Sequence, residues 1–198
     1  MAECSAEKGF IATAVEDVLA RANVPRESFE SHFNSTEDCA SAAFNKLASE
    51  MLATLSIAQE SAAAKGNPTV PIKAVLEMLA ARPAFSHLGL IGFRQGGTRR
   101  MYEAYDSAAR VLALMMERAL QESGDPGPSY AHARAALGGA EALLRRELAA
   151  GRAATLPSLL PDFVYAALVP FVGQREALRQ AIEAAGGAAE EDDGHRAT

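Results

Sequence analysis

Apolar residues recur at helical spacing along most of the chain and predict a series of helices. The first short helix is predicted over residues 13–23, where Thr13 and Glu16 have the spacing of a capping box. A second short helix is predicted over Arg26 to His32, with its aromatic residues Phe29 and Phe33 turned inward. Two short helices joined by a tight turn predict a helix-turn-helix segment.

Longer apolar stripes predict the rest of the architecture. A long helix is expected over 36–63, a shorter one up to Arg82-Pro83, and a short apolar segment over 85–93. Further helices are expected over 101–120, 129–150, 158–172 and 174–185. No segment alternates apolar and polar residues convincingly, so strands are not expected. The predicted fold class is all-α.

Breaks in the pattern predict the domain organisation. The strongest linker is Gly124-Asp125-Pro126-Gly127-Pro128. We expect a helix-turn-helix domain over 1–46 and a larger helical domain over 47–185. Residues 186–198 are small and acidic, which predicts a disordered tail.

Composition and charge narrow the class of protein. Hydrophobic residues make up 49% of the 198, enough for a substantial core. Two cysteines form no disulfide framework, and no signal peptide is recognised, so a cytoplasmic protein is expected. The apolar runs, broken by proline or glycine, fall short of the ~20 residues of a membrane span, so no membrane partner is expected. The net charge is -6, and residues 1–50, with four cations and nine carboxylates, hold -5 of it.

A set of N-terminal motifs adds a further signal: Glu7-Lys8-Gly9-Phe10, Thr13-Ala14-Val15-Glu16-Asp17-Val18, Ala20-Arg21-Ala22, Phe29, His32-Phe33 and Glu37-Asp38. In this order they resemble the DNA-binding signature of the TetR family of bacterial transcriptional regulators. The resemblance covers residues 7–38 and implies a DNA-binding domain over 1–46, with an antiparallel helical ligand-binding and dimerisation domain after it. It also implies a homodimer and operator DNA as partners.

The chain departs from the family pattern where that family contacts DNA. Only Met1 to Ala6 precede the first motif, so helix one is expected to be truncated. Pro25, Glu30 and Thr36 stand where the family usually has a capping Ser or Thr, a Tyr and a Lys. The last two usually hold phosphates. The residues expected to face a groove are Arg26, Ser28, Ser31, His32 and Thr36. The alternative is that they are solvated residues of a helix that no longer binds DNA.

A ligand region is expected between Phe85 and Tyr105, where apolar walls and a few polar groups are mixed. The candidate ligand-binding residues are Phe85, Phe93, Arg94, Arg99, Met101, Tyr102 and Tyr105. The expected ligand is small and apolar or amphipathic, and an arginine pointing inward would imply an anionic or carbonyl-bearing one. The alternative is that the aromatics are ordinary core and the arginines are surface charges.

Residues 130–172 are expected to form the dimer interface, because two helices there carry small and apolar residues on several faces. The alternative is that these residues form intramolecular core. No glycine-flanked nucleophile, phosphate loop or metal-spaced histidine pair is recognised, so neither an enzyme nor a cofactor is expected. The leading hypothesis is a ligand-responsive repressor. The rival is a module of the same fold that binds small molecules or proteins and has lost DNA binding.

Overall fold

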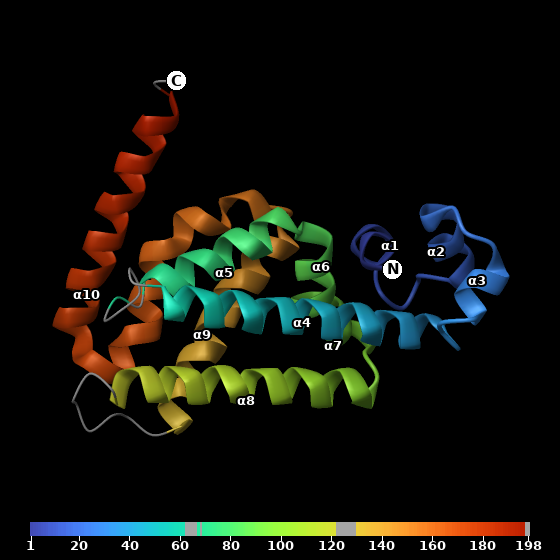
Figure 1. Cartoon of the computed structure of the whole chain (residues 1–198), viewed down its shortest axis with the longest axis horizontal. Helices are drawn as coiled ribbons and strands as arrows, with labels where there is room; N and C mark the ends of the chain where they lie inside the picture. The colour runs from blue at the N-terminus through green and yellow to red at the C-terminus, as the bar shows by residue number, and fades with distance from the viewer. Residues whose placement is uncertain (62–66, 68, 122–129, 197–198) are drawn as a thin grey trace.

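The computed structural model describes residues 1–61, 67, 69–121 and 130–196, with the backbone alone for 115–121 and 187–196. Every regular element in this part of the chain is helical, which confirms the all-α fold class (Figure 1). The elements are α1 (Ala2–Lys8), α2 (Val15–Ala22), α3 (Arg26–Glu30), α4 (Thr36–Glu60), α5 (Thr69–Ala81), α6 (Pro83–His87), η2 (Leu88–Gly92), α7 (Phe93–Gly96), α8 (Arg99–Gln121), α9 (Tyr130–Ala149), η3 (Ala153–Leu159) and α10 (Leu160–Arg196). The linker predicted at 124–128 lies outside the described residues.

Helices α1 to α3 form a small unit at one end of the molecule, beside the start of α4 (Figure 1). Its core contains Val18, Phe29 and Cys39, which are buried. Phe33 is half-buried, with its ring centroid 5.4 Å from that of Phe29. The inward orientation expected of both phenylalanines is therefore confirmed.

The start of α2 differs from the capping box predicted at Thr13. The helix begins at Val15, and the Asp17 carboxylate accepts a hydrogen bond from the Ala14 N–H at 3.0 Å. Thr13 is buried and donates instead to the carbonyl oxygen of Gly9 at 2.8 Å. The acidic residue three positions after the cap therefore satisfies the first backbone donor, and Thr13 holds the preceding loop.

The larger part of the molecule is a helical bundle that α4 enters directly from the small unit. Ser35 caps α4 by accepting a hydrogen bond from the Asp38 N–H at 3.1 Å, as its sequence indicates. The helix continues through residue 46, where the sequence suggested a domain boundary. Helices α8 and α4 lie side by side, and α5 meets the segment α6 to α7 at 105°. The bundle's core includes Leu76, Leu79, Leu156, Leu160 and Val164.

Helix α10 joins the two last predicted helices and extends further. Its helical geometry breaks at Gly173, whose φ of 78° lies in the left-handed region that favours glycine, so the predicted division at that point is confirmed. Beyond Gly186 the structure continues as helix to Arg196, where the sequence suggested a loose tail. Alanine and glutamate, which are frequent in this segment, favour helix even though the segment has few large apolar residues.

Length and composition alone would allow residues 153–186 to cross a membrane, with a mean hydropathy of 1.5 in the most apolar window. The sequence predicts no span because proline and glycine interrupt the apolar runs. Pro170 lies within regular helix, whereas the helical geometry breaks at Gly173. Phe163, Val164 and Leu168 lie in the core of the bundle. A core helix passes the same test, so this finding is weak support for a span.

Candidate functional site

The residues expected to contact DNA lie together on the outside of the small N-terminal unit. Arg26 and Ser28 belong to α3, and Ser31 and His32 follow it directly; all four are exposed. The side chains of Ser31 and His32 lie within hydrogen-bonding distance of each other and of the Ser28 carbonyl oxygen. Thr36 is half-buried at the first position of α4.

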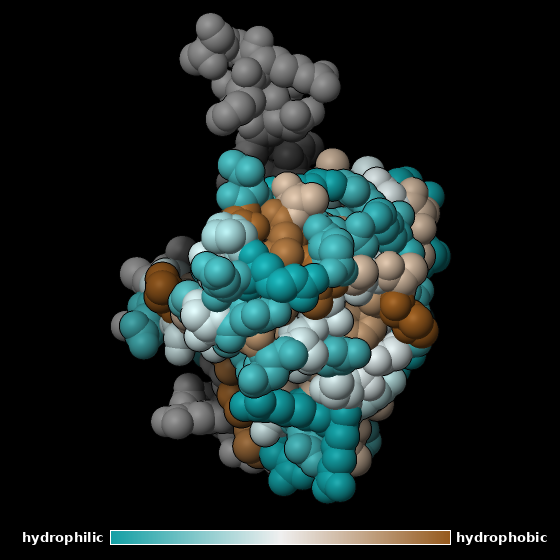
Figure 2. Space-filling view, turned by 90° about the vertical axis from the view of Figure 1, so that its right-hand side faces the viewer, coloured by the Kyte–Doolittle hydropathy of each residue, from teal (hydrophilic) through white to brown (hydrophobic). Residues whose placement is uncertain are grey.

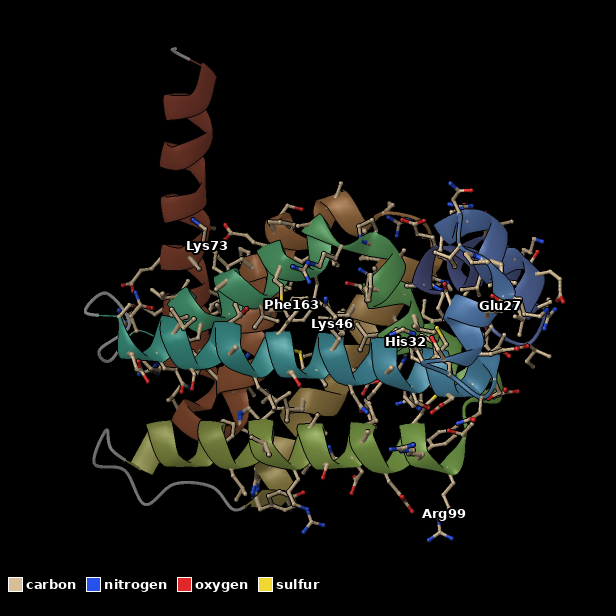
Figure 3. All side chains as sticks on the ribbon, turned by 45° about the vertical axis from the view of Figure 1, so that its right-hand side comes forward. Glu27, His32, Lys46, Lys73, Arg99 and Phe163 are labelled. Carbon is tan, nitrogen blue, oxygen red and sulfur yellow. The ribbon has the colours of Figure 1, made fainter. Side chains whose placement is uncertain are left out.

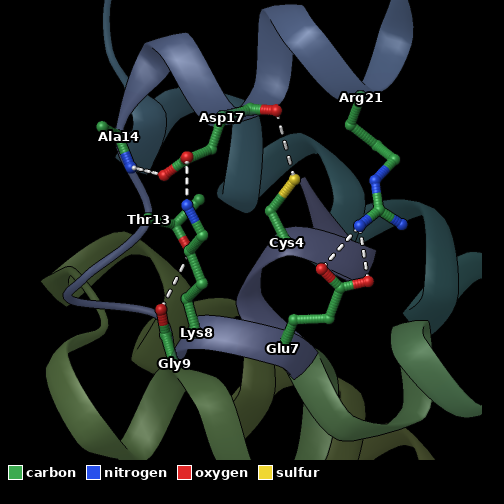
Figure 4. A network of polar contacts seen from close by, with 8 residues as sticks. All are labelled: Cys4, Glu7, Lys8, Gly9, Thr13, Ala14, Asp17 and Arg21. Atoms are coloured by element: carbon green, nitrogen blue, oxygen red, sulfur yellow. Dashed lines mark hydrogen bonds and ion pairs between the residues drawn. The ribbon is translucent and has the colours of Figure 1, made fainter.

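Most cations near this face are paired within the chain. Lys8 pairs with Asp17, and Arg21 pairs with Glu7 (Figure 4). Arg21 Nη1 also lies 3.2 Å from Glu3 Oε2. The hydrogen bond from Lys8, and then that from the Ala14 N–H, lower the pKa of Asp17. These pairs join α1 to α2, and they neutralise cations that could otherwise bind DNA phosphates.

Arg26, the only cation of α3, is also shared between carboxylates. It pairs with Glu16 of α2, and its Nη1 atom lies 3.4 Å from Glu30 Oε1. Glu27 is exposed on the same helix. Figure 2 looks onto this end of the molecule and shows a largely hydrophilic surface. The sequence showed the acidic balance of this region, but only the fold reveals that Arg26 is held by two carboxylates.

Two of the predicted ligand-binding residues instead fill a junction between the small unit and the bundle. Phe93 and Met101 are 0% and 1% exposed and pack with Phe10 and Phe44 in one apolar cluster. The ring centroids of Phe44 and Phe93 are 5.5 Å apart. Phe93 and Met101 therefore lie in ordinary core rather than in the wall of a pocket.

Arg94, Tyr105 and two residues of α9 form a polar cluster beside this junction. Arg94 Nη2 lies 2.7 Å from Glu141 Oε1 and 3.4 Å from the Tyr105 hydroxyl. Tyr105 and Arg145 also hydrogen-bond to the Glu141 carboxylate. Burial, and then the hydrogen bond to Glu141, raise the pKa of Tyr105. We call these four residues, Arg94, Tyr105, Glu141 and Arg145, the Glu141 cluster.

The remaining predicted ligand residues take separate positions. Arg99 points away from the body of the molecule, with its side chain 91% exposed, and pairs with Glu103 (Figure 3). Tyr102 is exposed and, with Arg99, borders an open and mainly charged recess on α8. Phe85 is half-buried against the core. Arg99 therefore does not face inward, because α8 turns it to solvent.

Sequence reasoning missed Glu141 and Arg145. They lie one helical turn apart, which resembles an ordinary surface ion pair, and nothing local indicates their partners on α7 and α8. Glu141 lies 47 residues from Arg94 and 36 from Tyr105, and its side chain is only 12% exposed. A carboxylate within an alanine-rich apolar helix was the one available signal.

The helices expected at a dimer interface bury much of their apolar surface within the chain. Ala133, Ala136, Phe163, Val164 and Leu168 are all buried, so for them the interpretation as intramolecular core is right. A different face of α9 remains exposed and carries small residues: Ala131, Ala135, Gly138, Gly139 and Ala142. Among the described residues, no group of three or more His, Cys, Asp or Glu side chains is placed to hold a metal ion.

Comparison with solved structures shows the fold. A structure described as the fatty acid degradation regulator FadR from Bacillus halodurans matches with a TM-score of 0.72 and 14% sequence identity. The match covers 85% of this chain and 92% of that one. No protein-family model matches the sequence, and a search of curated proteins also found no match. The likeness therefore shows that this chain shares its all-helical fold with that structure over most of both chains.

Proposed function

We propose that this protein is a ligand-responsive transcriptional regulator that acts as a homodimer. The observation that carries the proposal is the docking of a helix-turn-helix unit on a helical bundle, through Phe10 and Phe93, in a fold shared with a regulator. In such a dimer, two α3 helices would read successive major-groove turns, ~34 Å apart. A small apolar or amphipathic ligand would favour the conformer in which that spacing is lost.

The proposed dimer uses the outer face of α9 together with α10. The most apolar window of residues 153–186 is 33% buried within one chain, and most of the other side chains between residues 159 and 172 are half-buried. A Cβ atom added at Gly138 or Gly139 would meet no other atom within 4 Å, so this face leaves room for a second helix to approach. An apolar helix that its own chain covers only in part can complete its burial at a subunit interface.

The proposed regulatory function can be tested by measuring whether the protein binds DNA from upstream of its own gene. Fluorescence anisotropy with labelled DNA, at two salt concentrations and with unrelated competitor DNA, should show specific binding that weakens as salt rises. Equal affinity for both DNAs, or no binding, would contradict a repressor that recognises an operator.

A second candidate is a binding module of this fold that no longer contacts DNA. The pairing of Arg26 with Glu16 and Glu30 favours it, because the α3 cation is already neutralised and exposed carboxylates surround it. Each cation that is unavailable to phosphate lowers both affinity and its dependence on salt. Neither candidate assigns a catalytic residue.

A further inference from the structure

The Glu141 cluster contains more positive charge than its own carboxylate neutralises. Arg94 and Arg145 both bind Glu141, and Tyr105 donates a third hydrogen bond to the same carboxylate. Within the described part of the chain, no other carboxylate pairs with either guanidinium. The cluster therefore carries one uncompensated positive charge at neutral pH.

The surroundings of this charge are apolar on one side and open on the other. The Arg94 guanidinium carbon lies 5.3 Å from the ring centroids of both Phe93 and Tyr105, which stack 4.9 Å apart. The side chains of Arg94 and Arg145 are 43% and 33% exposed, so a molecule in solution can reach them. Tyr102 extends the aromatic surface, 5.3 Å from Phe93, and is 44% exposed.

We propose that the Glu141 cluster is a binding site for a small organic monocarboxylate, with the carboxylate on Arg94 and Arg145 and the apolar body toward the accessible rings of Tyr102 and Tyr105. Guanidinium groups bind carboxylates through paired, charge-assisted hydrogen bonds. A monoanion matches the single excess charge, whereas a phosphate monoester brings about -1.5 to -2 and would leave negative charge beside Glu141.

A chain of side-chain contacts connects the site to the helix-turn-helix unit. Tyr105 touches Glu141 on one side and stacks on Phe93 on the other, and Phe93 packs against Phe10 and Phe44 in the junction. A carboxylate that binds the arginines competes with Glu141 and changes the hydrogen bonds that hold Tyr105. This step rests on the proposed regulatory function, whereas binding at the site does not.

Isothermal titration calorimetry with benzoate tests the site, with benzamide as the neutral control of the same shape. Benzoate should bind the full-length protein more tightly than benzamide and inorganic phosphate. Arg94→Gln and Arg145→Gln should each weaken benzoate binding by about tenfold or more, because each removes a charge-assisted hydrogen bond. Arg99→Gln is the matched control and should leave the affinity unchanged.

Glu141→Gln gives the most specific result, because it removes the competing carboxylate and leaves both cations. It should tighten benzoate binding, whereas a purely structural cluster would only lose thermal stability. Equal binding of benzoate and benzamide, tighter binding of phosphate, or no benzoate binding by either the natural protein or Glu141→Gln would overturn the proposal. Circular dichroism melts check that each variant folds. If the protein binds benzoate but no DNA, the proposed carboxylate site is supported and the proposed regulatory function is contradicted.

Discussion

The charge on the helix-turn-helix face gives a quantitative prediction about DNA binding. The double variant Glu30→Tyr and Thr36→Lys restores the family-like residues and reduces the net charge of residues 1–50 from -5 to -3. Glu30 is exposed and shares Arg26 with Glu16, so removing it also leaves Arg26 with one carboxylate instead of two. We expect the variant to bind DNA more tightly than the natural protein.

The magnitude follows from the exposure of these groups. Removing a like charge at ~4 Å from a phosphate in water is worth about 1 kcal/mol, or about fivefold in affinity. One added lysine contact changes the slope of log affinity against log salt by about 0.9, so its advantage should shrink about three- to fourfold between about 50 and about 200 mM salt. Breaking the exposed Arg26–Glu30 pair, at 3.4 Å, should cost the fold no more than about 1 kcal/mol.

The assay is fluorescence anisotropy over this salt range, with a control of equal charge change placed away from α3. The control is Ala53→Lys with Glu103→Tyr, both at exposed positions on α4 and α8. An equal gain in the control would show that net charge alone acts. Specific nanomolar binding by the natural protein in physiological salt would refute the reasoning, and no binding by either protein would favour the module without DNA recognition.

Other predictions concern stability, pH and assembly. Phe93→Ala should destabilise the protein by about 3–5 kcal/mol and lower its Tm by about 6–20 °C in a thermal melt, because this 0%-exposed ring holds the junction. Hydrogen bonds from Arg152 and Arg146 lower the pKa of Glu147 from 4.5 to about 2. The ionised Glu147 carboxylate therefore stabilises the fold above a pH of about 4.5, and this stabilisation is lost as the pH falls toward 2. In urea titrations, the free energy of unfolding of Glu147→Gln should decline less steeply at acid pH than that of the natural protein. Burial lowers the pKa of His87 below 6.5, so the free energy of unfolding should fall as the pH drops through that value, and less so in His87→Leu. Ala135→Glu on the exposed face of α9 should give monomers in sedimentation, whereas Ala53→Glu should not; an unchanged dimer in both would reject this interface.

Local pattern was sufficient for the positions of most helices. The apolar stripe of α4, the cap at Ser35 and the break at Gly173 all depend on neighbours within one or two turns of the chain. The orientation of Phe29 follows from the same periodicity. These features were predictable because backbone hydrogen bonds and caps are satisfied within each element. The start of α2 was missed because Thr13 and Asp17 both have side chains able to cap, and the loop that Thr13 holds decided between them.

The candidate sites depended on which helices meet. Periodicity shows that Phe93 and Met101 are apolar, but not that Phe10 and Phe44 pack on them from the N-terminal unit. In the same way, Arg94 could face solvent or a partner until the bundle brought Glu141 beside it across 47 residues. The sequence by itself determined the positions of most helices, the acidic balance and the resemblance over residues 7–38. Only the tertiary structure decided which charges are neutralised and which rings are buried, because those interactions join residues whose separation along the chain carries no local signal.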